Sequence, residues 1–202
     1  PVEFEGLQLN LIDVPGLFDF EAGLYEGIMA AESVLVAVSA RIGLSVGAQK
    51  AYRLAEKNGK SRAFYISKVD AEIADFYKVF EQLKSEFGPS VCPVIVPFIE
   101  GDKHTYVNLI ENKAFTYAAG KPTQVDMPDM GHRLEGLMNA VYEAVAETDE
   151  ALMEKFFEGE PFTQEEMTEG VRIGVKTGTI APVLCGVSIQ MEATDMLLRY
   201  MK

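Results

Sequence analysis

The chain has no tryptophan, two cysteines and two histidines, and no apolar run that is long enough to cross a membrane or flanked like a signal peptide. Cys92 and Cys185 lack metal-type spacing and each lies in an apolar stretch, so we expect buried thiols in a reducing compartment. His104 and His132 stand apart from other potential ligands, which favours structural roles over catalysis. These absences predict a cytoplasmic protein without membrane contact.

Basic residues are also scarce. The chain carries 18 Lys and Arg against 31 Asp and Glu, a net charge of −13. Because binding to a phosphate backbone needs clustered Lys and Arg, this balance argues against a broad nucleic-acid-binding face. The acidic residues are densest between Glu143 and Glu169, in stretches that predict the solvated faces of helices. With 48% hydrophobic residues, the composition is that of a soluble globular protein.

The chain also lacks an initiating methionine and the usual phosphate-binding loop of nucleotide-binding proteins. The chain opens on Pro1 rather than on methionine, with strand-like residues almost at once, so we expect a piece of a longer protein. No segment has the pattern Gly-x-x-x-x-Gly-Lys-Ser/Thr, the loop that cradles the α- and β-phosphates of a nucleotide and supplies a hydroxyl to Mg²⁺. We therefore expect this piece to bind nucleotide feebly at best.

The most informative stretch runs from Leu7 to Phe20. Leucines alternate with polar residues at its start, which predicts a strand. Ile12 continues this strand, and we expect its end to be buried. Asp13 would end this strand, and a Pro-Gly turn at Gly16 would follow. A carboxylate at a strand end can hold Mg²⁺ through water, and a free glycine N–H can contact a terminal phosphate. The alternative is an ordinary strand followed by a turn.

The rest of the chain alternates strands with helices at both ends. This order is typical of a doubly wound parallel sheet, in which ligands bind at the carboxyl ends of the strands. The pattern predicts strands over 34–38, 62–66 and 180–187, and helices over 21–33, 45–58, 74–87 and 193–201.

The rhythm changes after Gly88. Short strand-like runs over 91–98, 106–110 and 114–117, with turns at 101–102 and 119–122, predict a small antiparallel meander. Helices are expected over 131–147, from 148 or 149 to 157, and over 163–178, where Thr163 and Glu166 have capping-box spacing. We therefore divide the chain into a core of residues 1–97 and 180–202 and an inserted α+β subdomain of residues 98–179.

Three predicted strand ends combine into one possible site: Asp13–Gly16, Ser67–Asp70 and Cys185–Ser188. In a GTPase, a carboxylate at the position of Asp70 would be suited to accept two N–H groups of guanine while the stem of Lys68 lies over the base. A backbone N–H near Ser188 could then meet the guanine carbonyl. Chance could supply each part, but their order and their common place at strand ends favour a real site.

Four segments, Leu11–Phe20, Ala74–Val79, Glu147–Glu160 and Pro182–Gly186, carry a resemblance to a known family. In these segments the chain resembles elongation factor G, the ribosome-dependent translocation GTPase, and especially its divergent bacterial paralogues. The resemblance implies a P-loop GTPase-type sheet, incomplete at the N-terminus, that carries an inserted α+β subdomain. It also implies that Asp13 binds Mg²⁺ and that Gly16 contacts the γ-phosphate. The guanine base would be bound by Ser67, Lys68 and Asp70 and by the backbone around Ser188.

The chain departs from that family at three positions. Leu17 stands where the family has a water-positioning histidine, so no catalytic residue is assigned, since leucine has no hydrogen-bonding group. Ser67 replaces the first residue of Asn-Lys-x-Asp, and Val187-Ser188 replaces a Ser-Ala pair. We expect weaker guanine binding and doubt fast hydrolysis by the usual route.

The resemblance places the phosphate-binding loop and its strand upstream of Pro1. That strand would lie between the strands predicted over 7–12 and 34–38, and losing it would leave unpaired backbone groups. Two arrangements would compensate: the neighbouring strands could close directly on each other, or another chain could cover the edge.

Two classes of function follow from these observations. The first is a fragment of a ribosome-associated translational GTPase that binds GTP or GDP with Mg²⁺, has the ribosome and its stalk protein as partners, and is inactive as a fragment. The second is a degenerate G domain that acts as a non-enzymatic ribosome- or protein-binding module. An unrelated doubly wound domain is a weaker alternative, because it would not explain the insertion.

Overall fold

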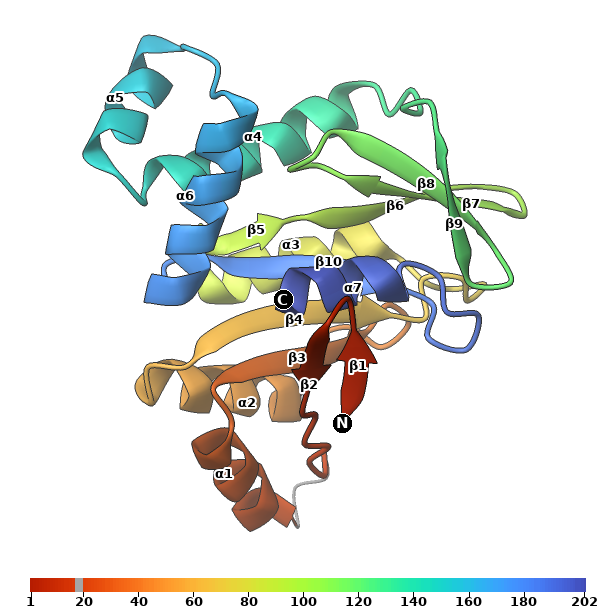
Figure 1. Cartoon of the computed structure of the whole chain (residues 1–202), viewed down its shortest axis with the longest axis vertical. Helices are drawn as coiled ribbons and strands as arrows, with labels where there is room; N and C mark the ends of the chain where they lie inside the picture. The colour runs from red at the N-terminus through yellow and green to blue at the C-terminus, as the bar shows by residue number, and fades with distance from the viewer. Residues whose placement is uncertain (17–19) are drawn as a thin grey trace.

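The computed structural model describes residues 1–16 and 20–202, and a four-stranded parallel sheet lies at its centre (Figure 1). The strands follow the order β3-β4-β10-β5, and all neighbours run parallel. This confirms the predicted α/β fold. The expected strand over 34–38 with both faces covered is wrong, however, because Leu35 and Ala37 are exposed on one face of this edge strand. The strands are β3 (Ser33–Ser39), β4 (Ser61–Ser67), β5 (Val91–Pro93) and β10 (Ala181–Gly186).

Helices cover the parallel sheet, and short polar side chains fix where two of them begin. Ser45 accepts a hydrogen bond from the Ala48 N–H at the start of α2, and Asp75 accepts one from the Lys78 N–H at the start of α3. Helix α2 packs on β3 and β4, and α7 packs on β10. These helices are α1 (Glu21–Ala30), α2 (Val46–Lys57), α3 (Phe76–Phe87) and α7 (Thr194–Met201).

A second, antiparallel sheet lies beside the first and has the order β6-β7-β8-β9, as the predicted meander requires (Figure 1). The apolar run over 91–98 splits at Val94, so its two halves enter different sheets. The Val94 N–H donates to Val183 O of β10 at 2.9 Å, and its carbonyl accepts from Leu109 N at 2.9 Å. The new strands are β6 (Ile95–Glu100), β7 (Lys103–Asn108), β8 (Lys113–Ala118) and β9 (Lys121–Val125).

Two details of the meander differ from the prediction. Lys121 and Pro122 begin β9 instead of belonging to a turn, which is possible because β9 is an edge strand and proline lacks an N–H to donate there. The boundary expected between residues 97 and 98 falls inside β6.

Three more helices connect the antiparallel sheet to β10: α4 (His132–Ala146), α5 (Glu150–Glu158) and α6 (Gln164–Thr177). The predicted capping box is present, with both reciprocal hydrogen bonds between Thr163 and Glu166. Beyond the end of α6, the Gly178 carbonyl accepts a hydrogen bond of 3.0 Å from Arg62 of β4. The insertion therefore closes back onto the parallel sheet.

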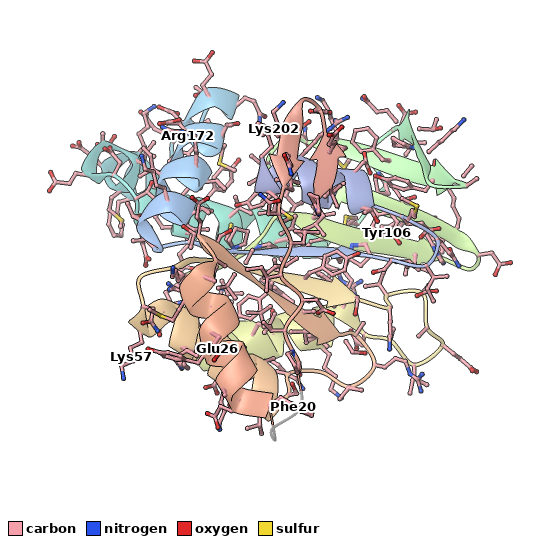
Figure 2. The ribbon with its side chains drawn as sticks, turned by 60° about the horizontal axis from the view of Figure 1, so that its bottom comes forward. Phe20, Glu26, Lys57, Tyr106, Arg172 and Lys202 are labelled. Carbon is pink, nitrogen blue, oxygen red and sulfur yellow. The ribbon has the colours of Figure 1, made fainter. Side chains whose placement is uncertain are left out.

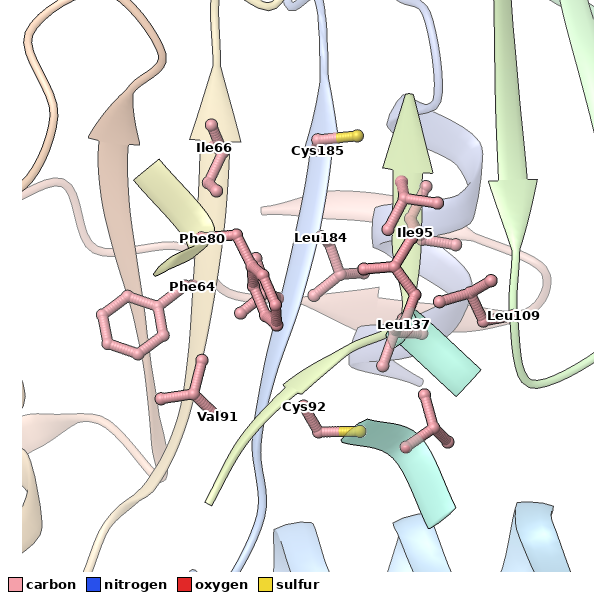
Figure 3. Packing of buried hydrophobic residues seen from close by; sticks show 14 of the residues in the cluster. Phe64, Ile66, Phe80, Val91, Cys92, Ile95, Leu109, Leu137, Leu184 and Cys185 are labelled. Atoms are coloured by element: carbon pink, nitrogen blue, oxygen red, sulfur yellow. The ribbon is translucent and has the colours of Figure 1, made fainter. Parts of the chain in front are cut away.

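One apolar core joins the two sheets and the helices (Figure 3). Phe64 and Leu184 enter it from the parallel sheet, Ile95 from the antiparallel sheet and Leu137 from α4. Cys92 and Cys185 are free and buried in this core, which confirms the expected buried thiols, and burial raises the pKa of Cys92 to about 12. Over residues 1–16 and 20–202, no helix is both long and apolar enough for a membrane crossing.

The N-terminal segment differs from the prediction. Its strand ends at Leu9 as β2 (Leu7–Leu9), which pairs antiparallel with β1 (Val2–Phe4) in a separate hairpin. Leu11 and Ile12 are 56% and 55% exposed, so the expected buried strand ending at Asp13 is wrong. The physical reason is that a tight turn lets β1 and β2 satisfy each other's backbone groups.

The hairpin is held by α7 and not by β3. Arg199 Nε lies 3.1 Å from Glu5 Oε1, and Lys202 donates to the Glu5 carbonyl at 3.4 Å, near the label of Lys202 in Figure 2. Within the part of the chain that is described, the ladder partner of β3 is β4 alone. Direct closure of the first strand onto β3 is therefore also wrong.

Two helical glycines provide a matched test of how α6 packs at the start of β10. A Cβ on Gly174 would lie 2.5 Å from the Ile180 side chain, whereas a Cβ on Gly136 in α4 meets nothing within 4 Å. We expect Gly174→Ala to lower the free energy of unfolding by about 1–3 kcal/mol through overpacking. Gly136→Ala should raise it by roughly 0.4–1 kcal/mol. Urea unfolding followed by circular dichroism measures both, and equal effects would contradict this packing.

Candidate functional site

The register of the parallel sheet aligns three strand ends. Ser39 of β3 is paired with Ser67 of β4, and Ser67 is paired with Gly186 of β10. The loops that follow these strands therefore leave the sheet at one edge, where α/β folds bind ligands (Figure 1). This places the predicted segments Ser67–Asp70 and Cys185–Ser188 side by side.

The loop after β4 presents one cation and one carboxylate around a buried anchor. Val69 is buried, whereas Lys68 and Asp70 on either side of it are exposed. Lys68 has a φ of 59°, a left-handed conformation that is uncommon for a residue with a side chain. The Ser67 hydroxyl donates to Val38 O at 3.3 Å, so this side chain ties β4 to β3. Lys68 and Asp70 are thus the two side chains free to meet a ligand here.

The loop after β10 is closed by its own backbone. Val187 N donates to Glu192 O at 3.2 Å, and Glu192 N donates to Val187 O at 3.0 Å, which leaves Ser188 exposed between them. A Cβ on Gly186 would lie 2.5 Å from Glu192 O and 2.6 Å from the Tyr65 hydroxyl. Only glycine fits at this strand end, because neither contact leaves room for a side chain.

Tyr65 belongs to β4, and its hydroxyl reaches across to Gly186 at the end of β10. Burial raises the pKa of its phenol, and the nearby Ser188 opposes that rise.

The loop with Asp13 and Gly16 lies against α1 and α2. Both residues are exposed, and a Cβ on Gly47 at the start of α2 would lie 3.3 Å from Gly16 O. Helix α2 is the next element after β3, so it begins near the edge at which β3 ends. Gly16, beside the start of α2, therefore lies toward the same edge as the other two loops. Leu17, the predicted replacement for a catalytic histidine, lies outside the described residues.

The donor set defines which ligands could bind. Among the residues that the structure describes, no three His, Cys, Asp or Glu side chains gather as metal ligands. Asp13 alone would hold Mg²⁺ only if phosphate and water oxygens completed the coordination, which is the usual way in which Mg²⁺ binds at phosphates. Lys68 and Asp70 can contact a planar ring that offers N–H donors, because a carboxylate accepts two such bonds.

The sequence analysis missed two residues that shape this edge. Tyr65 belongs to an apolar run that predicts only a buried strand, and Glu192 looks like one of many surface acids. Glu192 is in fact buried, and its carboxylate contacts Tyr106 and His104 of β7. These contacts span more than 80 residues of sequence, so no local pattern marks them.

Comparisons with known proteins point to one family. The sequence pattern described as the elongation factor Tu GTP binding domain matches residues 2–202. An elongation factor G-like protein of Thermotoga maritima is 29% identical over 201 residues, which are 99% of this chain and 29% of that protein. A crystal structure of a Thermus thermophilus protein has a TM-score of 0.88 and 32% identity, covering 100% of this chain and 30% of that one. The chain thus spans less than a third of either protein.

The left-handed backbone of Lys68 leads to a stability prediction. Lys68→Gly relieves roughly 1 kcal/mol of strain, which the greater freedom of the unfolded chain offsets, so the free energy of unfolding should change by less than about 0.5 kcal/mol. Lys57→Gly, in the last turn of α2, should lower it by about 1 kcal/mol. Thermal and urea unfolding measure both. An equal loss at the two positions would show that the Lys68 side chain is needed for folding.

Proposed function

The chain belongs to the elongation factor Tu GTP binding domain family, and on that basis we propose that it is the part of an elongation factor G-like translational GTPase that recognises guanine and senses the γ-phosphate. The observation that carries this proposal is the register that sets the loop of Lys68 and Asp70 beside the loop of Ser188. Two adjacent loops at one sheet edge can enclose a base from two sides.

Guanine recognition would rest on Asp70, Lys68 and the loop after β10. The exposed Asp70 carboxylate would accept the two N–H groups on one edge of guanine, while the Lys68 stem covers the ring. A backbone N–H of the Ser188 loop would donate to the guanine carbonyl. Ser67 would contribute indirectly, because its hydroxyl already donates to Val38 O. This arrangement supports guanine specificity, with a lower affinity than an asparagine in place of Ser67 would give.

Sensing of the γ-phosphate would belong to the loop of Asp13 and Gly16. Asp13 would hold Mg²⁺ through water and the Gly16 N–H would contact the phosphate, so the loop would be ordered while GTP is bound and released after hydrolysis. Movement of this loop would reach α1 and α2, because it packs on both and because Lys50 and Glu21 join these helices at 3.2 Å.

The partners of the intact protein would be the ribosome and its stalk protein, and its compartment would be the cytoplasm. Residues 98–179 would act as an inserted subdomain whose acidic helices α4, α5 and α6 form the protein-docking surface. Acidic faces of this kind suit a basic protein partner and not a nucleic-acid backbone.

A second candidate function is a non-enzymatic ribosome- or protein-binding module. One observation favours it: Val187 is only 4% exposed, so this side chain of the base loop is occupied within the protein. Nucleotide binding by the intact protein separates the two candidates.

Substitution of Asp70 tests guanine recognition in the full-length protein. We expect Asp70→Ala to weaken GDP binding at least about tenfold, because two hydrogen bonds to a charged acceptor are lost, and to leave the weak binding of ADP unchanged. Asp102→Ala, in the exposed turn between β6 and β7, is the matched control and should bind GDP normally. Titration with a fluorescent GDP analogue measures the affinities. A wild-type protein that binds no GDP would refute guanine recognition and favour the module.

The isolated chain should not hydrolyse GTP at a measurable rate. Its 202 residues contain no Gly-x-x-x-x-Gly-Lys-Ser/Thr loop, so nothing holds the α- and β-phosphates in place for the reaction. Release of inorganic phosphate measures the rate with purified chain. Turnover that disappears in the Asp70→Ala variant would contradict this expectation, whereas turnover that persists in it would indicate a contaminating enzyme.

A further inference from the structure

A buried carboxylate ties the loop after β10 to the antiparallel sheet. Glu192 is 9% exposed, and its Oε2 accepts a hydrogen bond of 2.6 Å from the Tyr106 hydroxyl. The same oxygen lies 3.0 Å from His104 Nδ1. Both partners belong to β7, and Figure 2 labels Tyr106 on this sheet. A buried carboxylate is costly unless it is hydrogen-bonded, so these contacts hold Glu192 in one place.

The position of Glu192 fixes the loop that carries Ser188. Its backbone makes both hydrogen bonds that close the loop on Val187, and its carbonyl oxygen occupies the space that Gly186 leaves free. Moving the Glu192 side chain would therefore move the backbone that pairs with Val187.

A second tyrosine of the antiparallel sheet holds the start of α7, which follows the loop of residues 187–192. Tyr117 of β8 donates its hydroxyl to Asp195 Oδ1 at 2.5 Å, in the first turn of α7. The rings of Tyr106 and Tyr117 pack edge to face with centroids 5.6 Å apart. Burial and the neighbouring Glu192 raise the pKa of Tyr106, and burial and Asp195 do the same for Tyr117. Both phenols therefore keep the protons that they donate.

We infer that Glu192 is a positioning residue, through which the antiparallel sheet sets the conformation of residues 187–192 and so the fit of the guanine. The inference rests on the proposed function for the part that concerns guanine. Its consequence is that a protein docked on β7 or β8 could alter nucleotide binding without touching the nucleotide, because the two tyrosines transmit a shift of these strands to the loop.

The test uses Tyr106→Phe and Glu192→Gln in the full-length protein. Tyr106→Phe removes one hydroxyl from a side chain of unchanged shape, and Glu192→Gln keeps an acceptor for Tyr106 while removing the charge. The matched control is Tyr77→Phe, which loses a hydroxyl bond of 2.7 Å to Pro97 O on β6 and none to residues 187–192. Melting temperatures confirm that each variant is folded.

Two measurements separate the inference from the proposed function. Hydrogen–deuterium exchange of residues 187–192 should become roughly tenfold faster in Tyr106→Phe, and GDP affinity should fall about tenfold, with smaller changes in Glu192→Gln. Tyr77→Phe should change neither. Normal exchange and normal affinity in Tyr106→Phe, or the same changes in Tyr77→Phe, would overturn the inference. If the wild type bound no GDP, the proposed function would fail, and the exchange rates alone would decide the role of Glu192.

Discussion

The parallel register of β3, β4 and β10 is the constraint on which the rest of the structure depends. It places Ser39, Ser67 and Gly186 in one line, so that the loops after these strands start from a common edge. Without a side chain, Gly186 lets the Tyr65 hydroxyl and the Glu192 carbonyl approach the strand end. A stagger by one residue would turn the alternate side chains to the other face and separate the loops.

Local sequence predicted the elements whose signals are local. The apolar runs over 34–38 and 62–66 indicated strands, although the first is covered on one face only, and Ser45 and the pair Thr163 and Glu166 marked where helices begin. The run over 91–98 was misjudged, because Val94 bonds to both sheets and only the tertiary fold shows where one strand stops. The N-terminal alternation also failed as a guide to burial, since a hairpin shows the same period as a strand inside a sheet.

The candidate site was predictable in part. Lys68 and Asp70 follow an evident strand, and Ser188 follows another, so their common edge could be expected from the α/β pattern. The supporting residues could not, because the contacts of Glu192 with β7 join segments that are remote in sequence. Asp13 stands apart: its place in an exposed loop was not expected, and its role as a Mg²⁺ ligand stays a prediction.

The central claim is that the edge formed by the loops of Asp70 and Ser188 recognises guanine. A crystal structure of the full-length protein with GDP tests it most directly. The account predicts that the Asp70 carboxylate lies within hydrogen-bond distance of the N–H groups of guanine, with the Lys68 stem over the ring and a backbone N–H of the Ser188 loop on the carbonyl. A guanine bound elsewhere, or held without contact to Asp70, would contradict it.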